Sequence, residues 1–97
     1  MNNQEIIKTE NVLVRIMKLA KDASTDWHYH TEVSDFFVCL NGVVMVESKN
    51  PDETVILHPG QLTEIKSPQV HRVKNIHDDI SEYLLAQAVG TYDFIKV

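Results

Sequence analysis

The stretch DWHYHTEVSDFFVCLNG, residues 26–42, places His28 and His30 one residue apart, immediately before a mostly apolar run. Alternate residues of a β-strand face the same side, so both imidazoles are expected to point together. Two imidazoles on one face can bind a single metal ion at about 2.0–2.2 Å. Solvent-exposed histidines on an edge strand have the same spacing, so this stretch alone leaves both interpretations open.

Around this stretch the chain consists of short segments rich in β-branched and aromatic residues, separated by turn residues. Most of these segments alternate between apolar and polar positions, as strands with one buried face do. About eight or nine short strands spaced about 8–12 residues apart predict an all-β barrel or sandwich, and a double-sheet jelly roll suits their number. We expect strands at 12–20, 27–31, 35–40, 43–48, 54–58, 62–66, 70–75, 81–89 and 92–97.

Three of these segments support more detailed predictions. Residues 35–40 are apolar at almost every position, which is typical of a strand buried on both faces. Asn41-Gly42 then predicts a two-residue hairpin turn into the strand at 43–48, because both residues tolerate positive φ angles. Residues 81–89 could form a helix, but their alternation and the short loops around them favour a strand.

The composition disfavours several classes of protein. The 97 residues, with 43% hydrophobic and 24% charged positions, suit one globular domain spanning residues 1–97. The net charge of −5 and the lack of a basic stripe disfavour nucleic-acid binding. No apolar run approaches the ~20 residues of a membrane span, and the N-terminal residues do not resemble a signal peptide. The single cysteine, Cys39, fits a reducing cytoplasm.

Two further residues extend the candidate site. Asp35 lies on the strand predicted after His30 and shares a face with Phe37 and Cys39. His71 lies in the alternating segment VHRVKN. A carboxylate and a third imidazole are the ligand types that can complete a site for a divalent metal.

The spacing of these residues resembles two sequence motifs of the cupin superfamily. The first motif, HxH(x)3–4E(x)6G, is similar to the pattern formed by His28, His30, Asp35 and Gly42. The second motif, G(x)5PxGxxHxxxN, is similar to the pattern formed by Gly60, His71 and Asn75. The resemblance implies a double-stranded β-helix, or jelly-roll barrel. It also implies a three-histidine metal centre with Asp35 as a fourth, weaker ligand, the histidines being His28, His30 and His71.

The sequence departs from these motifs at four positions. Asp22 stands where a leading glycine is usual, and the turn before the last histidine has Lys66 and Pro68 in place of proline and glycine. These are turn positions, so their loss affects geometry more than chemistry. Asp35 stands where glutamate is usual, and a metal bond tolerates only ~0.2 Å of misfit. Asp35 could bind the metal directly, bind it through water, or act from outside the coordination sphere.

The resemblance implies one divalent transition metal, which could be Fe, Mn, Ni, Co, Cu or Zn, with an open position for a small molecule. It implies a metal-dependent isomerase, lyase or dioxygenase acting on a small oxygenated or sugar-like substrate, with Asp35 as a ligand or a catalytic proton shuttle. The alternatives are a non-catalytic module that binds a ligand or a metal, and a jelly roll with a vestigial site. Cupins of this size usually form homodimers, and residues 12–20 and 92–97 are the expected contributors.

Four other polar residues are expected to lie outside the metal centre. His58 and His77 should be solvent-exposed loop residues, and Glu32 should point outward. Asn75 should form hydrogen bonds near a strand end. Cys39 is expected to be a small core residue, because free cysteines are most often buried.

Three residues on predicted strands could line the cavity. Tyr83 and Gln87 share one face of their strand. Arg15 has the parity of Leu13 and Met17, so it could point inward, where a cation would suit an anionic substrate. An edge-strand arginine that faces water is the favoured alternative.

Overall fold

In the computed structural model, which describes residues 2–97, the chain is all-β and forms two antiparallel sheets. None of these residues forms a helix that could span a membrane. The strands are β1 (Asn2–Lys8), β2 (Val12–Leu19), β3 (His28–Tyr29), β4 (Ser34–Asn41), β5 (Val44–Ser48), β6 (Glu53–Leu57), β7 (Leu62–Ile65), β8 (His71–Asn75), β9 (Ser81–Ala88) and β10 (Ile95–Lys96).

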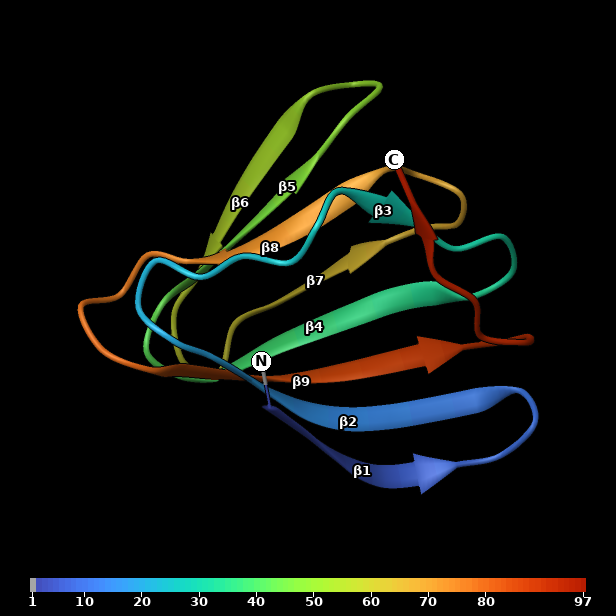
Figure 1. Cartoon of the computed structure of the whole chain (residues 1–97), viewed down its shortest axis with the longest axis horizontal. Coiled ribbons are helices and arrows are strands. Elements are labelled where there is room, and N and C mark those ends of the chain that lie inside the picture. The colour runs from blue at the N-terminus through green and yellow to red at the C-terminus, as the bar shows by residue number, and fades with distance from the viewer. Residues whose placement is uncertain (1) are drawn as a thin grey trace.

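Each sheet has five strands, in the order β1-β2-β9-β4-β7 in the first and β10-β3-β8-β5-β6 in the second. The sheets face each other, and the C-terminal segment runs from the end of β9 in the first sheet to β3 in the second (Figure 1). This arrangement is the predicted double-stranded β-helix, or jelly roll. Alternating residues of both inner faces form the core, and Cys39 belongs to it as expected.

Most of the strands lie close to their predicted positions, and residues 81–88 form a strand, as predicted. The strand β1 was not predicted. Its residues are exposed from Asn3 onward, so it lacks the alternation that marks a half-buried strand, and it is held by pairing with β2. The predicted strand at 92–97 is reduced to residues 95 and 96.

The predicted hairpin turn at Asn41-Gly42 is wrong. The strand before it belongs to the first sheet and the strand after it to the second, so the chain crosses between sheets here. Gly42 has a φ of +81°, and a Cβ at this position would overlap the Ser81 hydroxyl. Gly42 has the positive φ that we expected for a hairpin turn. A corner between two sheets requires the same backbone conformation, so the positive φ alone does not distinguish the two.

The prediction that residues 35–40 are buried on both faces is also wrong for the single chain. Asp35 and Phe37 on the inner face are buried, whereas Phe36 and Leu40 on the outer face are 38% and 43% exposed. Two packed sheets cover only their inner faces. The apolar residues on the outside of β4 therefore lie on the surface of the chain.

Asp22, which occupies the position of a motif glycine, has a φ of +63°. Aspartate enters this left-handed region at lower cost than most residues with a side chain. The turn before β3 therefore keeps a glycine-like backbone without glycine.

Asn75 forms hydrogen bonds near a strand end, as predicted, and it does so inside the protein. Its Oδ1 accepts a hydrogen bond of 2.7 Å from the Ser81 hydroxyl, whose oxygen accepts another from the Val43 N–H at 3.1 Å. These bonds fix the chain next to the corner at Gly42. The Nδ2 of Asn75 donates at 2.8–3.1 Å to three backbone carbonyls, those of Leu19, Ala20 and Asp79.

We expect the substitution Gly42→Ala to destabilise the fold much more than Gly60→Ala. Both glycines have positive φ, +81° and +87°, so each alanine costs about 1–2 kcal/mol in backbone strain. The new methyl group overlaps Ser81 at Gly42 but has nothing within 4 Å at Gly60. Overlap in a packed site adds about 1–3 kcal/mol. Urea unfolding of both variants measures the difference, and equal losses would mean that the corner is not closely packed.

Candidate metal centre

Two cross-strand pairs on facing sheets bring the candidate ligands together. In the first sheet Asp35 of β4 pairs with Gln87 of β9, and in the second sheet His28 of β3 pairs with His71 of β8. All four side chains are buried, and so is that of His30, which lies just beyond β3. Because the inner faces of the two sheets are packed together, residues far apart in the sequence meet here.

The four predicted ligands, His28, His30, Asp35 and His71, offer nitrogen and oxygen atoms that all lie within 4.8 Å of one another. Asp35 Oδ2 lies 2.7 Å from His71 Nε2 and 3.1 Å from His30 Nε2. Ligand atoms that share one ion at bond lengths of about 2.1 Å lie roughly 3 Å apart. The two distances from Asp35 Oδ2 are therefore those of neighbouring metal ligands, and the other pairs of ligand atoms lie close enough to join them after a small shift.

Each of the three imidazoles is oriented by a backbone carbonyl that accepts a hydrogen bond from its Nδ1. The distances are 2.6 Å for His28, 2.6 Å for His30 and 2.8 Å for His71. A carbonyl only accepts, so Nδ1 carries the hydrogen and Nε2 keeps its lone pair, which in His30 and His71 faces Asp35 Oδ2. Histidine ligands of metals are commonly held in this way. The carbonyls belong to Asp26, Asp93 and Gln69.

This arrangement leaves a polar contact that requires a cation. With hydrogen on Nδ1, the Nε2 lone pairs of His30 and His71 face the lone pairs of Asp35 Oδ2. The contact is favourable only if a second proton on the imidazole or a metal ion lies between the atoms. Three imidazoles and one carboxylate suit divalent Fe, Mn, Ni, Co, Cu or Zn, so the residues fit the metal that the resemblance implies.

Burial and mutual contacts shift the pKa values of three residues in the cluster. Burial would raise the pKa of Asp35, but hydrogen bonds with His30 and His71 and their charges outweigh burial and hold this pKa well below its usual range. Burial opposes a charge on His30, but the hydrogen bond and charge of Asp35 prevail and raise its pKa. Burial lowers the pKa of His28 to about 4.

Gln87 and Arg15 extend the cluster across the first sheet. Gln87 donates from Nε2 to Asp35 Oδ1 at 2.9 Å, and its Oε1 accepts from Arg15 Nη2 at 2.6 Å. The prediction that Tyr83 and Gln87 line the cavity is confirmed. The favoured interpretation of Arg15 as an edge-strand residue facing water is wrong: β2 lies between β1 and β9, and Arg15 shares the inner face of β2 with Met17 and lines the cavity.

The C-terminal segment, residues 91–97, covers one side of the cluster, which the sequence did not reveal. The carbonyl that orients His30 belongs to Asp93, 63 residues away. The carboxylate of Asp93 accepts hydrogen bonds from the Thr31 N–H at 2.9 Å and from the Thr31 hydroxyl at 2.5 Å. The Phe94 ring stacks on His28 with the ring centroids 4.1 Å apart. No local pattern marks these partners, and the segment folds back onto its own chain.

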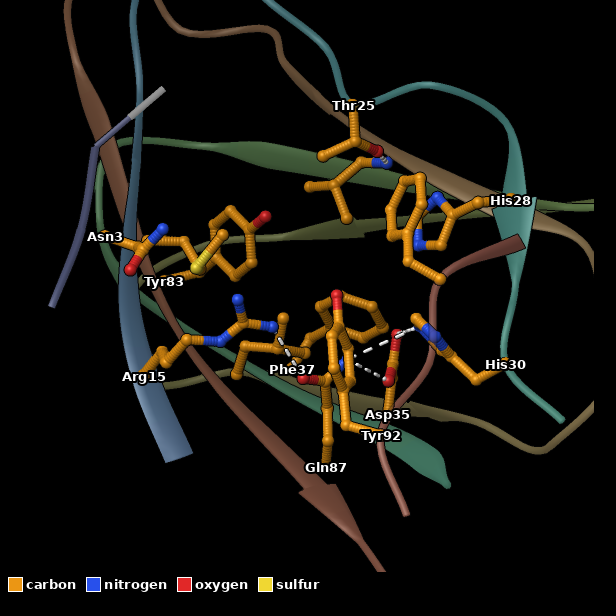
Figure 2. A pocket seen from close by; sticks show the side chains of 14 residues that line it. Asn3, Arg15, Thr25, His28, His30, Asp35, Phe37, Tyr83, Gln87 and Tyr92 are labelled. Atoms are coloured by element: carbon orange, nitrogen blue, oxygen red, sulfur yellow. Dashed lines mark hydrogen bonds and ion pairs between the residues drawn. The ribbon is translucent and has the colours of Figure 1, made fainter. Parts of the chain in front are cut away.

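A cavity of about 110 Å³ lies beside the cluster. Figure 2 shows Arg15 at one side and His28 and His30 at the other, with Gln87 and Asp35 between them. Typical sites for drug-sized ligands measure about 300–1,000 Å³, so this cavity suits a ligand of few atoms. Its walls are partly apolar, and the apolar residues are Met17, Phe37, Val73, Leu85 and Phe94.

Three polar residues lie outside the cluster, as the sequence predicted. His58 and Glu32 are exposed. His77 is only partly exposed and lies 3.5 Å from Asp78, but it does not reach the cluster.

Comparison with known proteins supports the fold. Residues 15–86 match the family model described as a cupin domain. A search of curated proteins found no match. Among solved structures, a double-stranded β-helix protein from Klebsiella pneumoniae has a TM-score of 0.84 and 18% identity, over 96% of this chain and 75% of that one. A protein from Thermus thermophilus has a TM-score of 0.83 and 21% identity, over 93% and 84%.

Larger enzymes contain a similar fold. An oxalate oxidase aligns with a TM-score of 0.82 and 13% identity, and the oxalate decarboxylase of Lactobacillus farciminis with 0.81 and 18%. The alignments cover 90% and 91% of this chain but only 46% and 27% of those enzymes. At these identities the similarity is one of fold.

In the metal-free protein, we expect the His28 ring to stay neutral down to about pH 4, with its hydrogen on Nδ1. A histidine in the unfolded chain takes up a proton near pH 6.5. Because folded His28 does not, the free energy of unfolding decreases as the pH falls from about 6.5 to about 4. His30, whose pKa is raised, has the opposite effect. Nitrogen-15 NMR of the rings measures both the tautomer and the titration. A His28 midpoint near 6.5 or hydrogen on Nε2 would contradict this expectation.

Proposed function

This chain belongs to the cupin domain family, and from this premise we propose that it is a metal-dependent enzyme acting on a small oxygenated substrate. The supporting observation is that His28, His30, Asp35 and His71 offer ligand atoms within 4.8 Å of one another, and that His28, His30 and Asp35 also line a small cavity. A site of this kind offers a ligand both a metal and a confined, partly apolar space. The reaction classes that we propose are isomerisation, elimination by a lyase, or dioxygenation.

In this proposal His28, His30 and His71 hold one divalent transition metal. A metal bound there supplies a Lewis acid that polarises an oxygenated substrate, or a centre that activates dioxygen. The backbone carbonyls orient the three rings in advance, so little reorganisation is required when the metal binds.

We assign Asp35 the role of a direct fourth ligand. Its Oδ2 lies among the Nε2 atoms at the separation of neighbouring ligands, although the side chain is shorter than glutamate. Gln87 occupies the other carboxylate oxygen, so Asp35 offers Oδ2 alone. The same oxygen could also accept or return a proton, which is the catalytic role proposed for Asp35.

We expect His30→Ala and His71→Ala to abolish stoichiometric metal binding. Each substitution removes one of three neutral nitrogen donors, while the matched control His58→Ala removes an exposed histidine outside the cluster. Elemental analysis after reconstitution with each candidate metal gives the metal-to-protein ratio. Unchanged metal content in His30→Ala would refute the assignment of the site.

Catalysis is tested with protein reconstituted with each metal and assayed against small hydroxy, keto and enol compounds and small sugars, with and without dioxygen. We expect turnover with at least one metal, and a loss of more than about 100-fold in Asp35→Ala, in line with the contribution of a positioned proton-transfer group. Tight binding of a compound without turnover under any of these conditions would identify a non-catalytic binding module instead.

We further propose that the chain forms a homodimer through the outer face of the first sheet. A row of apolar residues crosses four adjacent strands of this face in register, with Leu62 at its end 68% exposed. A second copy, related by a two-fold axis, would cover this row with the same apolar residues. The row consists of Ile16, Leu84, Val38 and Leu62.

Sedimentation tests the dimer. We expect Leu62→Glu to shift the protein toward monomer, because it places a charge within the apolar row. The control is Ile56→Glu, which changes a residue that is 50% exposed on β6 of the other sheet. Equal sedimentation of both variants and the parent protein would argue against this interface.

We also propose that residues 1–97 function as one cupin domain in the cytoplasm. Cys39 is a free thiol buried in the core, which is compatible with a reducing compartment.

A further inference from the structure

Arg15 lines the cavity, and among the residues that the structure describes no acidic side chain forms an ion pair with it. Its Nη2 donates to the neutral Gln87 amide, and its guanidinium carbon lies 5.1 Å from the centroid of the Tyr92 ring. The Nε atom is buried and has no hydrogen-bond acceptor among the residues that the structure describes. The ion pairs formed by residues 2–97 do not include Arg15.

This arrangement is unfavourable for the protein alone. The side chain of Arg15 is only partly buried, but its buried Nε donor without an acceptor costs about 1–3 kcal/mol. The Tyr92 ring recovers only about 0.5–2 kcal/mol through its π face. A ligand that brings a negative charge and an acceptor for Nε would remove this cost.

We propose that Arg15 binds the carboxylate of a small carboxylic acid whose second oxygen, a hydroxyl or keto group, faces the histidine cluster. This inference rests on the proposed metal site and adds the substrate class. The acid enters as its carboxylate, so that one end of the molecule is anionic and the other end is an uncharged oxygen donor.

The fork of N–H donors on arginine matches the two oxygens of a carboxylate. Nη2 is engaged with Gln87, which leaves Nε and Nη1 of Arg15 to donate. A single carboxylate charge is balanced by this single cation.

The charges at the two ends of the cavity favour an anionic ligand. Three neutral imidazoles, the Asp35 carboxylate and a divalent ion together carry about one positive charge, and Arg15 adds a second. Gln87 joins these ends through hydrogen bonds to both Arg15 and Asp35, so it keeps the cation from pairing with Asp35 directly. The volume of about 110 Å³ restricts the ligand to a short acid.

The test uses glycolate and its nearly isosteric neutral analogue glycolamide as ligands for the metal-loaded protein, with binding measured by titration calorimetry. We expect glycolate to bind at least 10-fold more tightly than glycolamide. Arg15→Met should weaken glycolate binding by about 10- to 100-fold and leave glycolamide binding unchanged. Arg15→Lys, which keeps the charge but loses the fork, should be intermediate.

The matched control is Lys18→Met, which removes an exposed cation three residues along the same strand. It should bind glycolate as the parent protein does. Elemental analysis and thermal melting of each variant separate loss of the metal or of the fold from loss of the carboxylate site. Equal binding of glycolate by a folded, metal-loaded Arg15→Met variant, or equal binding of glycolate and glycolamide by the parent protein, would overturn the proposal.

A second measurement decides the proposal even if no metal binds. In the metal-free protein, acetate provides the carboxylate without the second oxygen. We expect the NMR signal of the Arg15 Nε–H to shift on titration with acetate, to saturate, and not to shift with acetamide. A signal that does not respond to acetate would refute the carboxylate site, whereas failure of metal loading alone would refute only the proposed metal chemistry.

Discussion

The buried contact between Asp35 and the imidazoles of His30 and His71 is the constraint on which the rest of the structure depends. A carboxylate that is only 1% exposed must have partners for both oxygens, because an unpaired buried charge is too costly. Oδ2 faces the two imidazoles and Oδ1 accepts from Gln87. Asp35 belongs to one sheet and His71 to the other, so this contact also requires the sheets to meet at one particular register.

Two of the imidazoles are oriented by nearby backbone, and the third is oriented by a distant segment of the chain. His28 and His71 donate to carbonyls two residues before them, so the local course of the chain suffices to orient each ring. His30 instead donates to the carbonyl of Asp93 in the C-terminal segment. The family match ends at residue 86, so one ligand of the proposed centre depends on a segment outside the matched region.

The corner at Gly42 shows how fold and site are connected. Gly42 permits the close approach of Ser81, and Ser81 donates to Asn75 at the end of β8. The strand that begins with His71 is thus fixed at its far end to the start of β9, which carries Gln87. The hydrogen bonds of Asn75 therefore help to hold both sheets in the positions that the cluster requires.

The sequence by itself determined the all-β class, most strand positions and the set of four residues that meet in the core. These features follow from period-two alternation and from the spacing of His28, His30, Asp35 and His71, which are properties of residues near one another in the chain or in a motif. The sequence also predicted the positive φ at Gly42 and the hydrogen bonds of Asn75 near a strand end.

Only the tertiary structure decided which sheet each strand joins, and with it the features that depend on that choice. The turn at Gly42 is a corner because its two strands pair with β9 and β8 rather than with each other. Arg15 faces the cavity because the second sheet packs on the face of β2 that carries Arg15 and Met17. The carbonyl of Asp93 reaches His30 because β10 pairs with β3. Each of these contacts joins distant residues, and the energies that select them arise from burial and pairing that no local pattern encodes.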